Sequence, residues 1–366
     1  MNNRNKIHNG TEFGTVLAEY QDKAEEVPEL REARMPMKIV LTQRLDEAAM
    51  DLLEDSGAEV YTAESADFSQ FMDAMEEADS VIIRVGQLTA EIMDRCPKLR
   101  VIGLTGVGYD RVDVGHASEK GIPVVYTPGA NSLSVAEHTV ALMFSAAKNI
   151  TESDRELRKG SWKVRDAGKA FELSGKTVGI IGVGAIGAHV ARICQGIGMH
   201  TIAYSHSGNR KKVEAAGCEY CETMEELLRR SDFVTIHNPL TPETMNMITA
   251  RELGLMKRTA ILINTSRGPI VNEPDLREAL EQGVIAGAGI DVFAEEPALP
   301  DNPVFQAPNT VVTPHLAALT REAKSRMHVN AVKGVLALLS GETWQDVVDK
   351  NVCSIKAQTK TQKGES

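Results

Sequence analysis

The chain has 366 residues, of which 25% are charged and 42% hydrophobic, and its formal net charge is −11. The length suggests two domains, and the apolar content excludes a wholly disordered chain. No apolar run approaches the roughly 18 residues that a membrane span needs, and the acidic balance does not suit the neutralisation of nucleic-acid phosphates. We therefore expect a soluble globular protein with no membrane or nucleic-acid partner.

The cysteines and the N-terminus predict a cytoplasmic protein. Five cysteines are sparse and odd in number, which is typical of a reducing compartment. The first residues, MNNRNKIHNGTEFG, lack the apolar core of a signal peptide. Cys218 and Cys221 have the C-x-x-C spacing, but neither a second pair nor an H-E-x-x-H motif accompanies them, so we propose no metal site.

Both ends of the chain are polar. Residues 1–35 carry few apolar anchors and predict an N-terminal extension, partly helical over Thr15–Glu25. The last stretch, from about Cys353, is rich in Lys, Gln, Thr and Ser, and we predict a flexible tail over residues 347–366.

Short apolar runs alternate with amphipathic segments in the first third of the remaining chain. The segments Leu45–Asp55 and Ala117–Lys120 predict helices. Near-continuous apolar runs are typical of strands that are buried on both faces. This alternation predicts a parallel sheet with helices on both faces. The predicted strands are residues 38–42, 58–62, 80–84, 99–103 and 122–126.

A second alternating unit follows a long helix. The helix is predicted from Ser134 to Lys148, with Ser134 and Glu137 as a capping box. The charged segment 151–172 predicts an irregular arm outside the core, and a final helix is expected from Thr320 to Leu339. Two consecutive doubly wound α/β units explain the whole pattern. The strands of the second unit are expected at 177–181, 201–204, 233–236, 260–264, 286–293 and 310–313.

A glycine motif lies where the second unit begins. Gly182-x-Gly184-x-x-Gly187 follows a predicted strand and opens a predicted helix, with Ala185 and Ile186 inside the motif. The first glycine permits a tight turn, the second lets the backbone approach a pyrophosphate, and the third lets the helix pack close to the strand. The helix N-terminus favours the phosphate charge. The motif in this context predicts a bound dinucleotide.

The end of the next predicted strand indicates which dinucleotide is bound. NAD binders usually place a carboxylate there for the ribose 2′-hydroxyl, whereas this chain has Ser205 and no carboxylate before Glu214. His206, Ser207 and Arg210 follow, and hydroxyls with cations suit a 2′-phosphate. We predict NADP(H), with NAD(H) as the alternative if the cations only form a solvated helix face.

Three more motifs follow in order: INTSRGPIVNEPDL (263–276), GAGIDVFAEEP (287–297) and VVTPHLAALT (311–320). Together with the glycine motif, they resemble the D-isomer-specific 2-hydroxyacid dehydrogenase family. That family includes glyoxylate/hydroxypyruvate reductases and phosphoglycerate dehydrogenases. The resemblance extends over about residues 38–342. The sequence departs from the family where members commonly have glycines after the histidine, since this chain reads LAALT.

The resemblance implies a catalytic set. Arg267 matches the arginine that binds the substrate carboxylate, and His315 matches the acid/base at the carbonyl oxygen. Spacing alone does not choose between Glu295 and Glu296 as the partner of the histidine, but the resemblance selects Glu296. Asp291 matches a position near the nicotinamide. A guanidinium fork suits a carboxylate, and a histidine beside a carboxylate suits an acid that protonates a developing alkoxide.

The resemblance also implies binding residues on several loops. The first loops, within RVGQLT and TGVGYD, hold the substrate through backbone amides, which glycines expose. The substrate-binding residues expected there are Val85, Gly86, Gly106, Val107 and Gly108, together with Arg267. The remaining cofactor-binding residues expected are Pro239 and Thr265.

The expected architecture is α/β, with two doubly wound parallel-sheet domains. A Rossmann cofactor domain, 134–316, is inserted in a flavodoxin-like substrate domain made of 36–133 and 317–346. We expect the active site in the cleft at the carboxyl ends of the strands. The family's habit of pairing through the 134–170 region implies a homodimer, which Trp162 would help to anchor.

The expected function is hydride transfer between NAD(P)H and a small 2-oxo acid or D-2-hydroxy acid, with glyoxylate or hydroxypyruvate favoured. One alternative is a dinucleotide-sensing, corepressor-like binding protein, because such relatives use the same scaffold. Another is a dehydrogenase of 3-phosphoglycerate, formate or phosphite. The absence of a long C-terminal module after residue 342 makes a small 2-oxo acid the more plausible substrate.

Overall fold

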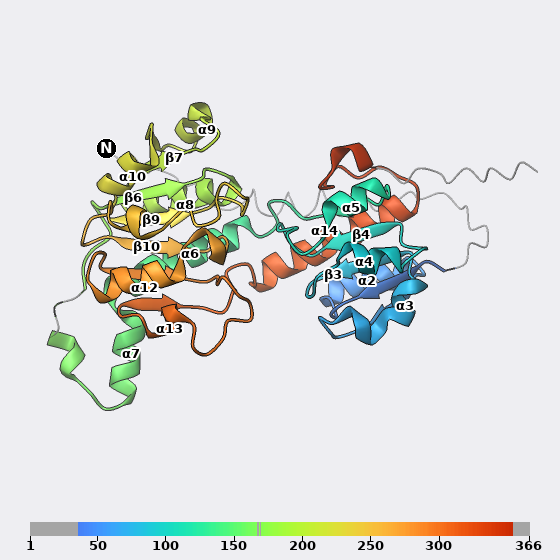
Figure 1. Cartoon of the computed structure of the whole chain (residues 1–366), viewed down its shortest axis with the longest axis horizontal. Coiled ribbons are helices and arrows are strands. Elements are labelled where there is room, and N and C mark those ends of the chain that lie inside the picture. The colour runs from blue at the N-terminus through green and yellow to red at the C-terminus, as the bar shows by residue number, and fades with distance from the viewer. Residues whose placement is uncertain (1–35, 167, 169, 354–366) are drawn as a thin grey trace, which may run out of the picture. The chain divides into compact units, whose positions relative to one another are not determined.

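A computed structural model describes residues 36–353 except 167 and 169. The predicted helix at Thr15–Glu25 therefore lies outside the described residues. The described residues from 37 onward belong to one unit, and its strands form two sheets (Figure 1). No helix in the described part is long and apolar enough to cross a membrane.

The first sheet has five strands in the order β2-β1-β3-β4-β5, and every pairing in it is parallel. This is the flavodoxin-like order, in which the chain starts inside the sheet and winds both ways. We call this sheet and its helices the five-stranded lobe. Its strands are β1 (Lys38–Leu41), β2 (Glu59–Thr62), β3 (Ser80–Ile83), β4 (Val101–Leu104) and β5 (Val124–Val125), and its first helices are α2 (Glu47–Asp55), η1 (Phe68–Phe71), α3 (Met72–Glu76), α4 (Ala90–Asp94) and α5 (Val114–Glu119).

The second sheet has seven parallel strands in the order β12-β11-β10-β9-β6-β7-β8. Reversed, its first six strands have the Rossmann order, with β6 and β9 at the point where the winding changes direction. We call it the seven-stranded lobe. Its strands are β6 (Thr177–Ile181), β7 (His200–Tyr204), β8 (Glu219–Tyr220), β9 (Phe233–Ile236), β10 (Ile261–Asn264), β11 (Gly287–Ile290) and β12 (Thr310–Val312).

The helices of this lobe alternate with the strands, as the sequence pattern predicts. They are α6 (Ser132–Lys148), α7 (Ile150–Arg158), η2 (Lys163–Asp166), α8 (Ala185–Gly196), α9 (Arg210–Ala215), α10 (Met224–Arg230), α11 (Ala250–Leu253), η3 (Gly268–Ile270), α12 (Glu273–Glu281) and α13 (Pro303–Gln306). The two doubly wound parallel sheets confirm the expected fold class.

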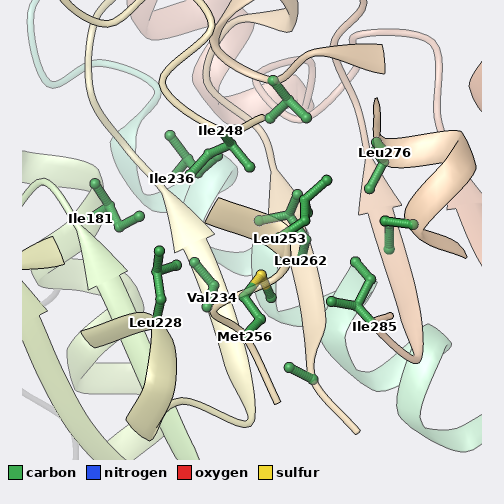
Figure 2. Packing of buried hydrophobic residues seen from close by; sticks show 14 of the residues in the cluster. Ile181, Leu228, Val234, Ile236, Ile248, Leu253, Met256, Leu262, Leu276 and Ile285 are labelled. Carbon is green, nitrogen blue, oxygen red and sulfur yellow. The ribbon is translucent and has the colours of Figure 1, made fainter. Parts of the chain in front are cut away.

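Buried apolar residues line both faces of the seven-stranded sheet. Figure 2 shows one of these clusters, in which β9 and β10 contribute Val234 and Leu262 and helix α12 contributes Leu276. These three side chains are fully buried. Each fully buried leucine or valine contributes about 1.5–3 kcal/mol relative to exposure. This packing holds the strand ends in place, and the candidate site is built on those ends.

The final helix returns to the first sheet. Helix α14 (Arg321–Leu339) packs against α2 and β4, and its Val332, Val335 and Leu338 are fully buried with Val101. The chain continues to pack beyond the predicted end of this domain at residue 346.

The start of the predicted flexible tail is ordered against the five-stranded lobe. Val347 is fully buried and forms an antiparallel bridge to Val125, and the amide of Val348 donates to the carbonyl of Val124. The prediction of a flexible tail is therefore wrong for residues 347–353, because β5 offers an unpaired edge that this segment covers. The rest of the predicted tail lies outside the described residues.

Two expectations around the long helix are also wrong. Helix α6 begins at Ser132, so Ser134 is inside the helix, where its buried hydroxyl donates to the carbonyl of Ala317 (2.7 Å) instead of forming a capping box. Part of the charged arm is regular, because Ile150–Arg158 forms α7, with ion pairs such as Arg158–Asp154 along its surface. Figure 1 shows α7 extending away from the seven-stranded sheet.

Candidate active site

Arg267 lies just beyond the carboxyl end of β10. The buried side chain of Asn264 fixes the turn, because its amide donates to the carbonyl of Arg267 (2.9 Å) and its Oδ1 accepts the amide hydrogen of Ser266 (3.0 Å). Gly268 lies against the backbone of Phe293 with no room for a β-carbon. The turn therefore holds Arg267 in one place at the edge of the sheet.

The guanidinium of Arg267 already binds a carboxylate in the structure. Its Nη1 donates to the carbonyl of Ser266 (2.8 Å), and its Nε and Nη2 donate to Oδ1 of Asp110 (3.2 and 3.0 Å). Gly108 lies so close to the guanidinium that a β-carbon would not fit. Burial raises the pKa of Asp110, but the charge and hydrogen bonds of Arg267 outweigh this effect and lower the pKa overall. The site is thus suited to an anionic group.

His315 and Glu296 form a pair near this edge. Nδ1 of His315 lies 2.6 Å from Oε2 of Glu296, and the other carboxylate oxygen accepts the amide hydrogen of Phe293 (3.2 Å). Burial raises the pKa of Glu296, but the hydrogen bond and charge of His315 outweigh burial and lower the pKa overall. The carboxylate fixes the ring and leaves Nε2 as the nitrogen able to deliver a proton. This geometry selects Glu296 over Glu295, which spacing alone does not.

Two charged residues at this site were not predicted from the sequence. Asp110 pairs with Arg267, as described above, and Nη2 of Arg111 lies 3.9 Å from Oε2 of Glu296. Both follow the Gly106–Gly108 turn directly. That adjacency to a turn expected to hold substrate is the signal that could have singled them out.

Asp291 directly follows β11 and binds the loop that carries His315. It is fully buried, and its carboxylate accepts hydrogen bonds from the hydroxyl of Thr313 (2.5 Å) and from the amides of Leu316 and Ala317 (both 3.0 Å). The resemblance places this residue near the nicotinamide. In the structure its carboxylate oxygens hold the backbone of the neighbouring loop.

The glycine motif has the geometry of a phosphate cradle. Gly182 has φ +93°, and a β-carbon there would collide with Oδ1 of Asn238, while Gly187 packs against the carbonyl of Gly182. Gly184 caps the N-terminus of α8, and no atom within 4 Å would meet a β-carbon at this position. Ala185 and Ile186 are the first helical residues after this open position. The residues present fit a dinucleotide pyrophosphate.

The end of β7 carries hydroxyls and cations, as the sequence indicates. The hydroxyls of Ser205 and Ser207 lie 3.1 Å apart, and His206 and Arg210 are exposed. Arg210 has two further partners that the sequence did not reveal. Its guanidinium lies 4.5 Å from the ring centroid of Tyr220 and pairs with Glu222.

Pro239 and Thr265, the other expected cofactor residues, follow β9 and β10. Pro239 is exposed, and its carbonyl accepts the hydroxyl of Thr244 (2.7 Å). Thr265 is buried, and its hydroxyl lies 2.8 Å from the hydroxyl of Thr139 on α6. Both residues therefore lie at the same edge of the sheet as the glycine motif, since β6 is parallel to β9.

The expected substrate loops follow β3 and β4. The hydroxyl of buried Thr42 accepts the amide hydrogens of Arg84 (3.0 Å) and Val85 (3.3 Å), so the amide of Val85 already has a partner. Gly86 has φ +89°, a backbone conformation that glycine allows. The expected residues Gly106 and Val107 follow β4 beside Gly108.

A Rossmann lobe with a phosphate cradle, and an arginine and a histidine–carboxylate pair on its strand ends, define a dinucleotide-dependent oxidoreductase. The comparisons with known proteins specify the family. Residues 140–317 match the model of the D-isomer specific 2-hydroxyacid dehydrogenase NAD-binding domain. This chain belongs to the D-isomer-specific 2-hydroxyacid dehydrogenases and is an NAD(P)-dependent oxidoreductase.

Several relatives resemble most of the chain. It is 40% identical over 314 residues to D-3-phosphoglycerate dehydrogenase of Methanocaldococcus jannaschii. This match covers 86% of this chain and 59% of that protein. It is 36% identical to glyoxylate reductase of Korarchaeum cryptofilum, over 88% of this chain and 98% of the relative.

A solved structure with a named activity resembles the structure of this chain. The NADPH-dependent glyoxylate/hydroxypyruvate reductase of Sinorhizobium meliloti, in complex with NADP and malonate, has a TM-score of 0.77 and 28% identity. The match covers 87% of this chain and 98% of that one. This chain thus covers 98% of each of the two named reductases but 59% of the phosphoglycerate dehydrogenase from M. jannaschii.

Proposed function

We propose that the protein reduces a small 2-oxo acid to the D-2-hydroxy acid, with glyoxylate or hydroxypyruvate as the favoured substrate. The observation that carries the proposal is the set formed by Arg267, His315 and Glu296 at the carboxyl edge of the seven-stranded sheet. A carboxylate binder and a proton donor are the two groups that this reaction needs from the protein.

Each residue of the set has a distinct part in the proposed reaction. The guanidinium of Arg267 binds the substrate carboxylate through its planar fork, in place of Asp110. Bound NAD(P)H would supply the hydride that adds to C2. His315 gives the proton from Nε2 to the carbonyl oxygen as the C–O π pair becomes an alkoxide pair, which balances the reduction. Glu296 stabilises the imidazolium that must exist beforehand.

The substrate preference rests on the binding loops and on the relatives. The loops expected to hold the substrate offer mainly backbone amides, such as that of Gly86, which suits a small anion. The K. cryptofilum and S. meliloti proteins are named for glyoxylate or hydroxypyruvate, and the chain covers 98% of each.

A substrate panel tests the preference. Initial rates of NADPH oxidation would be measured with glyoxylate, hydroxypyruvate, pyruvate, phenylpyruvate and 2-ketogluconate. We expect glyoxylate or hydroxypyruvate to have the highest kcat/KM. A preference for phenylpyruvate or 2-ketogluconate would contradict the proposal of a small substrate.

We also propose NADP(H) as the preferred cofactor. Ser205 stands where a carboxylate would repel a 2′-phosphate, and Ser207 and Arg210 lie beside it. Glu222 competes for Arg210, so the phosphate must replace that exposed ion pair, which costs little.

The substitution Ser205→Asp should weaken NADPH binding by about tenfold or more through like-charge repulsion, with NADH binding retained. Calorimetric titration checks this, and tighter NADH than NADPH binding by the unaltered protein would refute it.

We further propose a homodimer that forms through the arm after α6. Helix α7 has no buried residue, and Ile150, Leu157 and Trp162 are 51–65% exposed. Apolar side chains exposed together on one segment are typical of an interaction surface. Light scattering coupled to gel filtration should give the mass of two chains, and Leu157→Asp should reduce it. A monomeric mass for the unaltered protein would exclude the dimer.

A further inference from the structure

A buried polar network supports the loop that carries His315, and it includes residues that have no assigned part in the reaction. Asp291 is its centre. The carboxylate is 0% exposed and accepts hydrogen bonds from Thr313 Oγ1 (2.5 Å) and the amides of Leu316 (3.0 Å) and Ala317 (3.0 Å). The network therefore holds the loop on both sides of His315.

His138 on helix α6 completes this network. Its Nε2 lies 3.0 Å from Oγ1 of Thr313 and 3.6 Å from Oδ1 of Asp291, and its side chain is 18% exposed. Because the hydroxyl of Thr313 donates to the carboxylate, it must accept from His138, which is therefore the donor at Nε2. One turn earlier on the same helix, Ser134 donates to the carbonyl of Ala317 (2.7 Å).

The backbone at His315 explains why the loop needs such support. Its φ is +49°, in the left-handed region that residues other than glycine adopt rarely. A conformation of this kind persists only where the surroundings determine it fully. The amide of His315 also donates to the main-chain carbonyl of Asp291 (2.7 Å). Asp291 thus holds His315 directly through its main-chain carbonyl, and its carboxylate holds residues on either side of His315.

We propose that His138 and Thr313 are positioning residues that fix His315 through Asp291. The inference rests on the proposed function for the role of His315, but not for the loop geometry. His138 donates to the hydroxyl of Thr313, so that this hydroxyl donates in turn to the carboxylate of Asp291. The carboxylate, held in this way, accepts the amide hydrogens of Leu316 and Ala317. These bonds maintain the left-handed turn that directs the imidazole of His315 toward Glu296.

Kinetics of three variants test the proposal. His138→Ala and Thr313→Val should each lower kcat by about tenfold or more, because small displacements of a reacting group are costly. KM for the 2-oxo acid and Kd for NADPH should stay within about twofold, since neither ligand is bound by these side chains. His138→Gln should restore most of kcat, because its amide can donate to the same hydroxyl.

A matched control separates positioning from general loss of stability. His328 is buried and, like His138, lies close to a carboxylate, since its Nδ1 is 3.0 Å from Oδ1 of Asp46, but it belongs to the five-stranded lobe. His328→Ala should leave kcat unchanged. The proposal is overturned if His138→Ala keeps normal kcat, if His138→Gln is no better than His138→Ala, or if the main loss is in Kd for NADPH.

A structural readout keeps the inference independent of turnover. A crystal structure of the His138→Ala variant should show the loop at Leu316–Ala317 detached from Asp291 and His315 outside the left-handed region. An unchanged loop would overturn the inference whatever the substrate proves to be. If instead the unaltered protein reduces no 2-oxo acid while the loop moves as expected in the variant, the proposed function fails and the positioning network stands.

Discussion

At the scale of single residues, the guanidinium of Arg267 should be irreplaceable by an ammonium. Its Nε and Nη2 both contact Asp110 and its Nη1 contacts Ser266, which a lysine cannot reproduce. Arg267→Lys should lower kcat/KM for the 2-oxo acid by about 100-fold, equivalent to about 2.7 kcal/mol. Arg277→Lys, at an exposed ion pair with Glu281 on α12, is the matched control and should change nothing. Equal rates for the two variants would remove Arg267 from the mechanism.

The pair of His315 and Glu296 predicts a particular pH dependence. Burial raises the pKa of Glu296, but the hydrogen bond and charge of His315 lower it more, so the pKa is lowered overall. The carboxylate therefore stays ionised throughout the neutral range. Glu296→Gln removes the charge that stabilises the imidazolium. We expect kcat for reduction to fall and its optimum to move to lower pH, measured as initial rates across a buffer series. An unchanged profile would show that Glu296 does not act through His315.

The positions of some site residues could be predicted from the sequence because short motifs determine their local structure, whereas the catalytic roles came from the resemblance. Arg267 lies in the turn directly after β10. The glycine motif lies directly between strand β6 and helix α8. Glu296 could be separated from Glu295 only by the resemblance, since the choice depends on which carboxylate faces His315. Asp110 and Arg111 directly follow the Gly106–Gly108 turn, but their pairing with Arg267 and Glu296 could not be predicted, because these partners lie more than 150 residues away in the chain.

At the scale of elements, helix α14 is joined to α2 by a buried histidine. Nδ1 of His328 accepts the amide hydrogen of Asp46 (3.0 Å), a bond that protonation of Nδ1 would remove. Burial lowers the pKa of His328, and the Asp46 carboxylate opposes this effect without reversing it. A histidine with a lowered pKa stabilises the fold above its unfolded pKa and loses that contribution as the pH falls through its folded pKa.

The resulting prediction concerns acid stability. The urea midpoint should fall as the pH is lowered from about 7.5 to about 5.5, across and below the unfolded pKa of about 6.5. We expect the His328→Gln variant to be less stable at neutral pH, but its urea midpoint should fall less between these two pH values. Parallel pH profiles for the two proteins would show that His328 carries no such linkage.

Most element positions could be predicted because the strands are buried on both faces. Strands β6 and β9 coincide with their apolar runs. Strand β5 is shorter than its predicted run, and the C-terminal segment pairs with it through Val347 and Val348. Helix α7 was expected to be irregular because its residues are charged, but ion pairs three and four positions apart, such as Arg158–Asp154, support an exposed helix.

At the scale of the whole molecule, the alternation of strands and helices could predict two doubly wound sheets, and the order of motifs could predict the family. The return of α14 to the first sheet came from the resemblance, because no local signal says which sheet a helix covers. The end of the packed chain was misjudged for the same reason. Val347 reads as part of a polar tail, yet it covers the edge of β5.

The most direct test is one assay on the intact protein, with NADPH binding and turnover of glyoxylate or hydroxypyruvate measured on the same sample. Calorimetry gives the binding, and the decrease of NADPH absorbance gives the turnover. The arrangement of Arg267, His315 and Glu296 predicts both tight binding and rapid oxidation of NADPH when either 2-oxo acid is added. Tight NADPH binding without turnover of either acid would contradict the proposed reaction and favour a dinucleotide-sensing protein on the same scaffold.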